Sequence, residues 1–289
     1  MQDKLPEKIL FFKMSGAGND FIIIDNRNGK YSEEASFLAQ KICCRRYSAG
    51  ADGLILIENS KRATFRARFY NSDGSEFNLC GNGGRCAARF AFINVIAAKH
   101  MTIETNAGVL GAEIIQNNVK IQFPLPVQVE MNKVIHTDEG RRIKGHYVKI
   151  GDPHFMVFTK NLTEFPIESI AKKIRYSPSF GEAGTNVNFI MQIRENRFAI
   201  RTYERGVEQE TFACGSGCVS AAITLHRLFS PYASYVFETH AGFLLGVYLE
   251  IVDDEIKEMF LEGDARLIYK GELLSEAWKY ELKNAQDVS

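Results

Sequence analysis

Two cysteines, each at the start of a glycine-rich segment, are the residues best suited to chemistry in this sequence. Cys80 opens Cys-Gly-Asn-Gly-Gly-Arg, and Cys214 opens Cys-Gly-Ser-Gly-Cys-Val. Each segment leads into a run that fits a helix. A helix N-terminus carries unpaired N–H groups and partial positive charge, so we expect a thiol there to have its pKa lowered from about 8.5. The glycines let backbone N–H groups approach and hold a carboxylate.

A matched pair of thiols fits the inversion of a stereocentre. Such a reaction removes a proton from one face of a carbon and delivers one to the other face, which requires two acid/base groups of similar pKa. The carboxylate of an amino acid held between two helix N-termini would have its developing enolate-like charge stabilised. No pyridoxal cofactor is then needed in principle. The alternative for any single cysteine is a small buried packing residue, and we interpret Cys86 and Cys218 in that way. We interpret the adjacent Cys43 and Cys44 as a core residue and a surface neighbour rather than a redox pair.

The two cysteines belong to an internal repeat. Cys80 and Cys214 are separated by an offset of 134 residues, and the same offset relates further matching segments. These segments are Thr105-Asn-Ala-Gly108 with Thr239-His-Ala-Gly242, Ala49-Gly50 with Ala183-Gly184, and the apolar runs that begin at Phe21 and Phe155. Several matches in the same order indicate that the chain contains two copies of one unit. A solenoid needs at least three units, so the two copies predict two similar domains. We expect the first domain at 1–130, with a strand near 265–275 as a candidate to complete it, and the second at 131–264.

The elements that would position the cysteines follow from the residue pattern. Segments rich in Ile, Val, Phe and Thr predict strands at 9–14, 21–25, 54–58, 64–70, 101–105, 109–115 and 119–123. Asn117-Asn118 predicts a hairpin turn. Helices are expected at 33–45, 82–98, 167–175 and 215–229, with Pro231 ending the last. Short turns join most strands, which predicts an α+β fold in which mixed or antiparallel sheets, or barrels, surround a central helix.

Composition excludes several classes of protein. The 289 residues carry 35 Lys+Arg and 35 Asp+Glu, and this balance gives no global field for nucleic acid or an anionic membrane. The apolar runs are shorter than the roughly 20 residues of a membrane span, and the first residues lack a secretory pattern. Six cysteines without C-x-x-C spacing predict free thiols and no zinc site. We therefore expect a soluble cytoplasmic protein with a small-molecule substrate and no metal.

Several motifs, in order along the whole chain, resemble the diaminopimelate epimerase family. They are Ser15-Gly-Ala-Gly-Asn-Asp-Phe21, Asn71-Ser-Asp-Gly-Ser-Glu76, Asn78-Leu-Cys-Gly-Asn-Gly-Gly-Arg-Cys86, Tyr203-Glu-Arg-Gly206 and Ala213-Cys-Gly-Ser-Gly217. The resemblance implies the two-domain fold, no cofactor or metal, and conversion of L,L-diaminopimelate to the meso form, a precursor of lysine and peptidoglycan. It also implies a homodimer, with Tyr269 as a candidate contact.

The resemblance also implies roles for individual residues. Cys80 would donate a proton and Cys214 accept one in one direction, with the roles exchanged in the other, while His154 and Glu204 would poise them. The segments Gly81-Asn82 and Gly215-Ser216 would bind the reacting carboxylate. The residues implied to hold the rest of the substrate are Asn19, Asn71, Asn186, Glu204 and Arg205. Arg205 suits a distal carboxylate because a guanidinium can grip it with two hydrogen bonds.

Asp152 departs from the family pattern, which has Gly-Asn-Pro-His where this chain has Gly-Asp-Pro-His154. An ionised carboxylate only accepts hydrogen bonds, so Asp152 would repel a substrate carboxylate unless it turns toward the distal ammonium group or toward Arg205. This change motivates an alternative, a racemase of another amino acid or of broad specificity. A phenazine-type isomerase would share the architecture but would not be expected to keep both cysteines. A non-catalytic amino-acid-binding protein would need no matched acid/base pair. We expect the segment beyond Glu272 to be a polar terminus.

Overall fold

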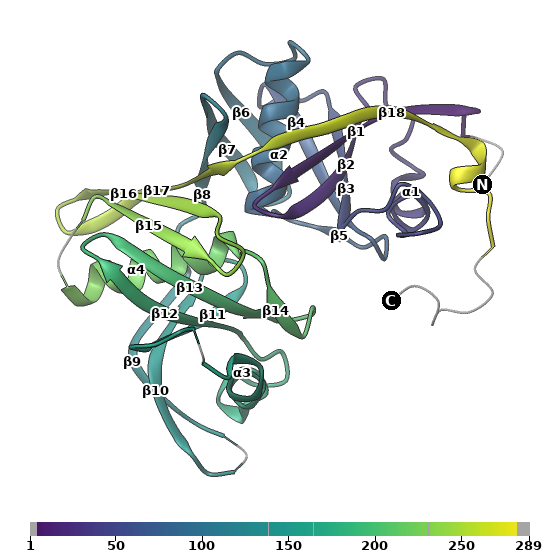
Figure 1. The fold of residues 1–289 in the computed structure, drawn as a ribbon. Helices are drawn as coiled ribbons and strands as arrows, with labels where there is room; N and C mark the ends of the chain where they lie inside the picture. The colour runs from purple at the N-terminus through teal and green to yellow at the C-terminus, as the bar shows by residue number, and fades with distance from the viewer. Residues whose placement is uncertain (1–4, 138, 164, 230–231, 282–289) are drawn as a thin grey trace. The chain divides into compact units, whose positions relative to one another are not determined.

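The computed structural model describes residues 5–137, 139–163, 165–229 and 232–281 (Figure 1). The chain divides into two compact units, the first formed by Met1–Ile121 with Asp264–Ser289 and the second by Gln122–Gly263. The C-terminal strand is therefore part of the unit that contains the N-terminus. Each unit is described by itself below.

The described residues of the first unit form a sheet, two α-helices and one short 3-10 helix. Its strands are β1 (Lys8–Gly16), β2 (Asn19–Asp25), β3 (Gly53–Glu58), β4 (Phe65–Asn71), β5 (Glu76–Phe77), β6 (His100–Thr105), β7 (Gly108–Ile115), β8 (Asn118–Phe123) and β18 (Arg266–Leu274). Its helices are α1 (Ala35–Ile42) and α2 (Gly81–Ile93), followed after β18 by the short helix η3 (Ser275–Ala277). The strands pair in the order β18-β1-β2-β3-β4-β6-β7-β8; β2/β3 and β4/β6 are parallel and the other pairs antiparallel. The sheet is thus mixed, as predicted.

The second unit repeats this connectivity. Its strands are β9 (Gln128–His136), β10 (Arg142–Lys149), β11 (Pro153–Phe158), β12 (Asn186–Arg194), β13 (Arg197–Glu204), β14 (Gln209–Thr211), β15 (Ser234–Thr239), β16 (Leu244–Val252) and β17 (Glu255–Asp264). Its helices are α3 (Ile167–Arg175), η2 (Pro178–Phe180) and α4 (Gly215–Phe229). The pairing order β9-β10-β11-β12-β13-β15-β16-β17 has parallel pairs at β11/β12 and β13/β15, the same places as in the first unit. The repeat in sequence is therefore a repeat of fold.

The helix that follows each repeated cysteine lies inside its own sheet. Helix α2 contacts β1, β2, β3, β4, β7 and β18, and α4 contacts β10, β11, β12 and β16. A helix can touch strands so far apart in one sheet only if the sheet curves around it. Gly81–Ala88 are consecutively buried, and most of these residues are small, which permits this close packing. The predicted central helix is confirmed.

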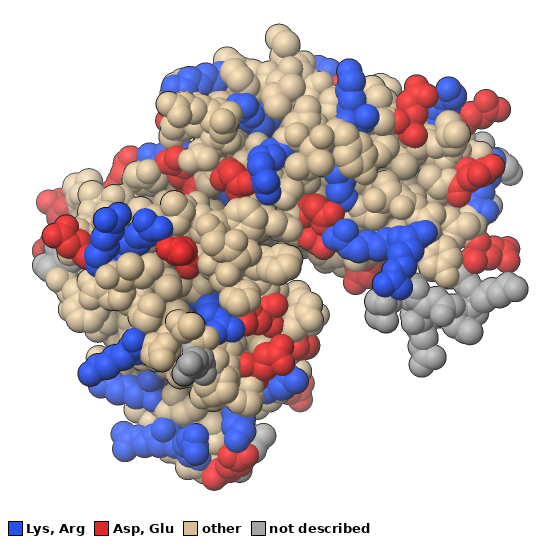
Figure 2. Space-filling model, viewed as in Figure 1, with Lys and Arg blue, Asp and Glu red and all other residues tan. Residues whose placement is uncertain are grey.

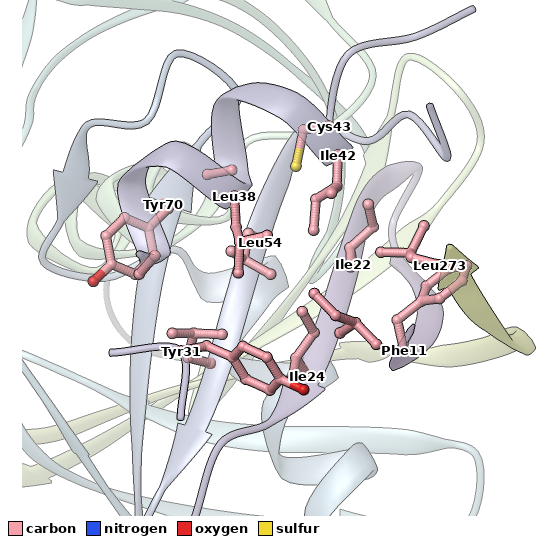
Figure 3. Packing of buried hydrophobic residues seen from close by; sticks show 14 of the residues in the cluster. Phe11, Ile22, Ile24, Tyr31, Leu38, Ile42, Cys43, Leu54, Tyr70 and Leu273 are labelled. Carbon is pink, nitrogen blue, oxygen red and sulfur yellow. The ribbon is translucent and has the colours of Figure 1, made fainter. Parts of the chain in front are cut away.

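The other face of each sheet is covered by the remaining helix. Ile22 and Ile24 of β2 pack in one cluster with Leu38 of α1 (Figure 3). Phe21 lies on the opposite face of β2, which packs against α2. A Cβ atom built on Gly83 of α2 would lie 3.3 Å from the Phe21 ring. A strand buried on both faces has no polar alternation, which explains the continuous apolar run of β2. In the second unit α3 covers its sheet in the same way.

Strand positions and two helices agree with the sequence analysis, whereas two helices are shorter than predicted. The helix expected at 33–45 is Ala35–Ile42, and the one expected at 82–98 is Gly81–Ile93. Val95 has a φ of 56°, a left-handed backbone conformation that ends a right-handed helix such as α2. The N–H groups of Ile96 and Ala97 both donate to the carbonyl of Ala91. The hairpin turn is centred on Gln116-Asn117, one residue earlier than expected. Pro231 lies outside the described residues.

The segment beyond Glu272 is not simply a polar terminus. Leu273 and Trp278 are 5% and 0% exposed and belong to the same apolar cluster as α1. The backbone N–H of Trp278 donates to Ser275, which fixes the short helix η3 over the sheet edge. The sequence interpretation missed this because a single tryptophan between charged residues gives no periodicity.

Charged groups of both signs are interspersed over the face shown in Figure 2. This distribution agrees with the zero formal net charge. Across the described residues, the structure holds no helix that combines the length and apolar character required to cross a membrane.

Candidate active site

Cys80 is the N-cap residue of α2. Its backbone is extended (φ −121°, ψ 125°), and its carbonyl accepts the N–H of Gly84 at 2.7 Å. Its sulfur accepts the N–H of Gly83 at 3.5 Å. The thiol therefore lies at the positive end of a buried helix, where the Cys-Gly-Asn-Gly pattern predicts it.

Asn19 brings an amide to the Cys80 thiol. The Asn19 Oδ1 lies 3.5 Å from Cys80 Sγ, and its Nδ2 donates to Asp52 Oδ2 at 2.7 Å. Because a carboxylate only accepts, Asp52 holds the amide nitrogen and turns the amide oxygen toward the sulfur. Asp52 is held in turn by Arg45, whose Nη2 contacts Asp52 Oδ1 at 2.9 Å and Asp20 Oδ1 at 2.5 Å. Arg45 is thus an ion-pair partner of both carboxylates.

The other expected residues of the first unit lie at the same end of the sheet or at the helix start. Gly81 and Asn82 are the first residues of α2 and are buried; the Asn82 Oδ1 accepts from Arg85 at 2.8 Å. Asn71 is the last residue of β4, and its backbone pairs with Gly53, next to Asp52. Its Nδ2 donates to Ser75 within the turn that follows.

Cys214 precedes α4 as Cys80 precedes α2. Its carbonyl accepts the N–H of Cys218 at 3.1 Å, which closes the first turn. The Ser216 Oγ lies 3.5 Å from Cys214 Sγ and 3.0 Å from His154 Nε2. The hydroxyl therefore stands between the imidazole and the thiol. His154 is 0% exposed and lies on β11, which begins directly after Asp152.

Burial controls the titration of these groups. It lowers the pKa of His154 to about 4, so the imidazole is neutral near pH 7. Dense packing around the Cys214 sulfur raises its pKa well above the usual value, and the Glu204 carboxylate raises it further; the Ser216 hydroxyl and the Gly217 N–H act in the opposite direction. The expected lowering of a helix-start thiol pKa is thus wrong for Cys214, because desolvation outweighs the donors.

Glu204, Asn186 and Arg205 form a second group in the same unit. Glu204 Oε1 accepts from the Thr211 hydroxyl at 2.6 Å. Asn186 Oδ1 accepts the backbone N–H of Arg205 at 2.8 Å, and its Nδ2 donates to the Pro153 carbonyl at 3.0 Å. The Asn186 side chain thereby ties the segment of Arg205 to the strand that leads into His154.

Asp152 forms an ion pair with Arg205. This is one of the two orientations expected for a carboxylate at that position, and the guanidinium compensates the charge that would otherwise repel an anionic substrate. It also occupies the guanidinium that was expected to bind the distal carboxylate. Any dianionic amino acid that uses Arg205 must compete with Asp152 for it.

The sequence analysis missed Asp52, Asn188 and Thr202. Asn188 lies on β12, two residues after Asn186, and its side chain contacts His154 Nδ1 at 3.2 Å. Thr202 on the neighbouring strand donates to Asn188 Oδ1 at 2.9 Å. The signal was present in the sequence, because polar residues at alternate positions of an otherwise apolar strand must find buried partners. Cys86 and Cys218 are 0% exposed, which confirms them as packing residues, and Cys44 is buried beside Cys43 rather than at the surface.

Each unit thus presents a thiol at a glycine-rich helix start, with polar groups that contact the sulfur. Such a thiol can exchange a proton, and the neighbouring N–H groups can hold a carboxylate. The family model described as diaminopimelate epimerase matches residues 11–137 and 146–268. The chain belongs to the diaminopimelate epimerase family. It is an amino-acid epimerase by this membership.

Relatives agree with the assignment, and solved structures share the fold. The chain is 40% identical to a diaminopimelate epimerase of Hydrogenobaculum sp. (strain Y04AAS1), covering 93% of this chain and 99% of the relative. It is 36% identical to that of Aquifex aeolicus (strain VF5), with the same two coverages. A hydroxyproline epimerase from Agrobacterium vitis superposes with a TM-score of 0.71 at 14% identity, covering 99% of this chain and 98% of the other. A PhzF-family protein of Bacillus anthracis gives 0.71 at 18%, covering 93% and 100%. At these identities the structural likeness shows the fold alone.

Proposed function

We propose that this protein interconverts L,L- and meso-diaminopimelate in the synthesis of lysine and peptidoglycan precursors, with Cys80 and Cys214 as its acid/base pair. The observation that carries the proposal is the repeated placement of one thiol before the central helix of each compact unit. The two units are proposed to act as the two epimerase-like domains. Membership of the family supports diaminopimelate as substrate.

The reaction balances with these two thiols. In one direction the Cys214 thiolate takes the α-proton, and the electron pair of the C–H bond moves into the carboxylate as an enolate-like charge. The Cys80 thiol then gives its proton to the opposite face of the same carbon. The product leaves Cys214 protonated and Cys80 as thiolate, ready for the reverse direction. No oxidant, reductant or cofactor is required by this balance.

The binding roles follow from the contacts in each unit. Gly81, Asn82, Gly215 and Ser216 are proposed to hold the reacting carboxylate, because helix N-termini present free N–H groups to an anion. His154 and Glu204 are proposed to poise Cys214. The remaining substrate-binding residues are proposed to be Asn19, Asn71, Asp152, Asn186 and Arg205.

One observation favours keeping a second candidate substrate class. The Asp152–Arg205 ion pair places a carboxylate and a guanidinium together where the distal end of the substrate is proposed to bind. An amino acid whose distal group is uncharged or cationic would bind without breaking this pair. A racemase for such an amino acid is therefore the alternative.

Proton NMR in deuterated water tests the proposal. Reduced protein is incubated with L,L- and meso-diaminopimelate, and separately with glutamate, lysine and other amino acids. We expect deuterium to enter the α-position of diaminopimelate and exchange to be lost in Cys80→Ala and Cys214→Ala. The matched controls are Cys86→Ala and Cys218→Ala, which alter buried cysteines on the same two helices and should retain exchange. Exchange only in another amino acid would establish the alternative. No exchange in any substrate would contradict catalysis and favour a binding protein.

We also propose that the protein is a homodimer that associates through β18. Leu267, Ile268 and Tyr269 are consecutive, and each is at least 39% exposed, so both faces of the strand present apolar groups. Tyr269 rests edge-on against Phe11 at a ring distance of 5.8 Å, which fixes its ring. A second copy of the chain would cover this strand. Light scattering should give the dimer mass for the wild type and the monomer mass for Tyr269→Asp; a monomeric wild type would contradict the proposal.

A cytoplasmic location is proposed because all six cysteines are free thiols. A reducing compartment maintains thiols in that state. Fractionation of expressing cells, followed by immunodetection of the protein, tests this location. Recovery outside the cytoplasmic fraction would contradict it.

A further inference from the structure

We propose that Asn188 is a positioning residue that holds His154 in the Nε2–H tautomer and thereby turns the hydroxyl hydrogen of Ser216 toward the Cys214 sulfur. The proposal rests on the proposed role of Cys214 and deepens it. All of its residues lie in the second unit.

The orientation of the Asn188 amide is determined by its neighbours. Its Oδ1 accepts from the Thr202 hydroxyl at 2.9 Å. Its Nδ2 faces acceptors, with the Phe155 carbonyl at 3.5 Å and the Met156 sulfur at 3.9 Å. A carbonyl oxygen accepts only, so the reversed amide would place oxygen against oxygen. Asn188 is 0% exposed and Thr202 is 3% exposed, so water does not compete for these contacts.

A fixed amide nitrogen determines the tautomer of His154. Asn188 Nδ2 lies 3.2 Å from His154 Nδ1 and can only donate to it. Nδ1 must therefore be the unprotonated acceptor, and the single proton of the neutral ring must be on Nε2. Burial keeps the ring neutral by lowering its pKa to about 4; Asp152 raises that pKa and Arg205 lowers it. The ring nitrogen that carries the proton points at Ser216.

The tautomer then determines the direction of the next hydrogen bond. His154 Nε2–H donates to Ser216 Oγ at 3.0 Å, so the serine oxygen is the acceptor of that bond. The serine hydrogen is left to donate to Cys214 Sγ, 3.5 Å away. The chain Thr202→Asn188→His154→Ser216→Cys214 thus runs in one direction, every donor pointing toward the sulfur.

This direction matters because Cys214 lies where burial and Glu204 disfavour the thiolate, and Cys218 acts in the same sense. A hydroxyl donor stabilises the thiolate and offsets part of that penalty. A group that must both take and give the α-proton needs thiol and thiolate close in free energy. If the proton were on Nδ1, Ser216 would donate to His154 Nε2 instead, and the sulfur would lose its donor.

The position of the proton on His154 tests the proposal directly. Two-bond proton–nitrogen correlation NMR of the ¹⁵N-labelled full-length protein distinguishes protonated from unprotonated ring nitrogens. The His154 signals are identified by their loss in His154→Gln. We expect an unprotonated Nδ1 and a protonated Nε2 in the wild type. A protonated Nδ1 in the wild type would overturn the proposal, whether or not the protein epimerises diaminopimelate.

Asn188→Asp tests the causal step. A carboxylate accepts only, so we expect the proton to move to Nδ1 and kcat to fall by roughly 10-fold or more, with KM for diaminopimelate within about twofold. Ser220→Ala removes a buried hydroxyl of α4 that has no hydrogen-bond partner and lies outside this hydrogen-bond chain; it is the control and should retain the wild-type ring signals and kcat. An unprotonated Nδ1 in Asn188→Asp would refute the assignment. If that variant does not fold, the wild-type spectrum still decides.

Discussion

Gly217→Ala is predicted to disable the site by displacing Asn188. A Cβ built on Gly217 would lie 2.4 Å from Asn188 Oδ1, closer than real contacts allow, and 3.4 Å from the Cβ of Cys214. Asn188 is fully buried and cannot swing into solvent. The substitution therefore displaces its amide and breaks the bonds to Thr202 and His154.

The magnitude follows from two opposing effects. Each buried group left without its hydrogen bond costs about 1–3 kcal/mol, which for two bonds is roughly 2–6 kcal/mol. Alanine within a helix contributes about 1 kcal/mol in the other direction. We expect the free energy of unfolding to fall by roughly 1–5 kcal/mol, with kcat reduced.

Urea denaturation and initial-rate kinetics measure both effects. The matched control is Ser220→Ala on the same helix, where a fully buried hydroxyl has no hydrogen-bond partner and its removal should leave stability and kcat unchanged or improved. In an Asn188→Ala background the clash is absent, so Gly217→Ala should no longer destabilise. Wild-type stability and kcat in the single Gly217→Ala variant would refute the steric argument.

Three further predictions concern acidity, the core and specificity. Burial depresses the folded-state pKa of His154 to about 4, against an ordinary value near 6.5, so its contribution to the free energy of unfolding is complete above pH 6.5 and is lost as the pH falls toward 4. Chemical denaturation across that pH range should show a smaller loss of stability in His154→Gln than in the wild type. An equal loss in both proteins would contradict the assignment. Trp278→Ala should lower the free energy of unfolding by about 3–5 kcal/mol, because it leaves a cavity at a fully buried site in the apolar cluster that contains α1. A decrease below about 1 kcal/mol in urea denaturation would show that the C-terminal segment is not anchored there. Asp152→Asn should lower KM for diaminopimelate several-fold with little change in kcat, because the guanidinium of Arg205 no longer has an internal carboxylate to release. Asp25→Asn, which breaks the surface pair with Arg27, is the kinetic control. An unchanged KM in Asp152→Asn would show that Asp152 does not determine substrate specificity.

The sequence was sufficient to predict the repeat, the mixed sheets and the buried helix behind each thiol. These features depend on local pattern: glycine-rich turns, continuous apolar strands and small residues along a helix. The ends of the two shortened helices were less predictable, because they are set by where Val95 takes a left-handed backbone and by which residues α1 can bury.

The tertiary structure decided the electrostatics of the site. The sequence places Cys214 at a helix start, which by itself predicts an acidic thiol, yet the packing around its sulfur reverses the direction of the pKa shift. Desolvation depends on every neighbour in space, so no local motif encodes it. The same holds for Asn188 and Asp52, which act through side chains that chain folding brings together. The sequence therefore determines the identity and the order of the motifs. The burial of the Cys214 thiol and the direction of the hydrogen bonds around it are determined only by the folded structure.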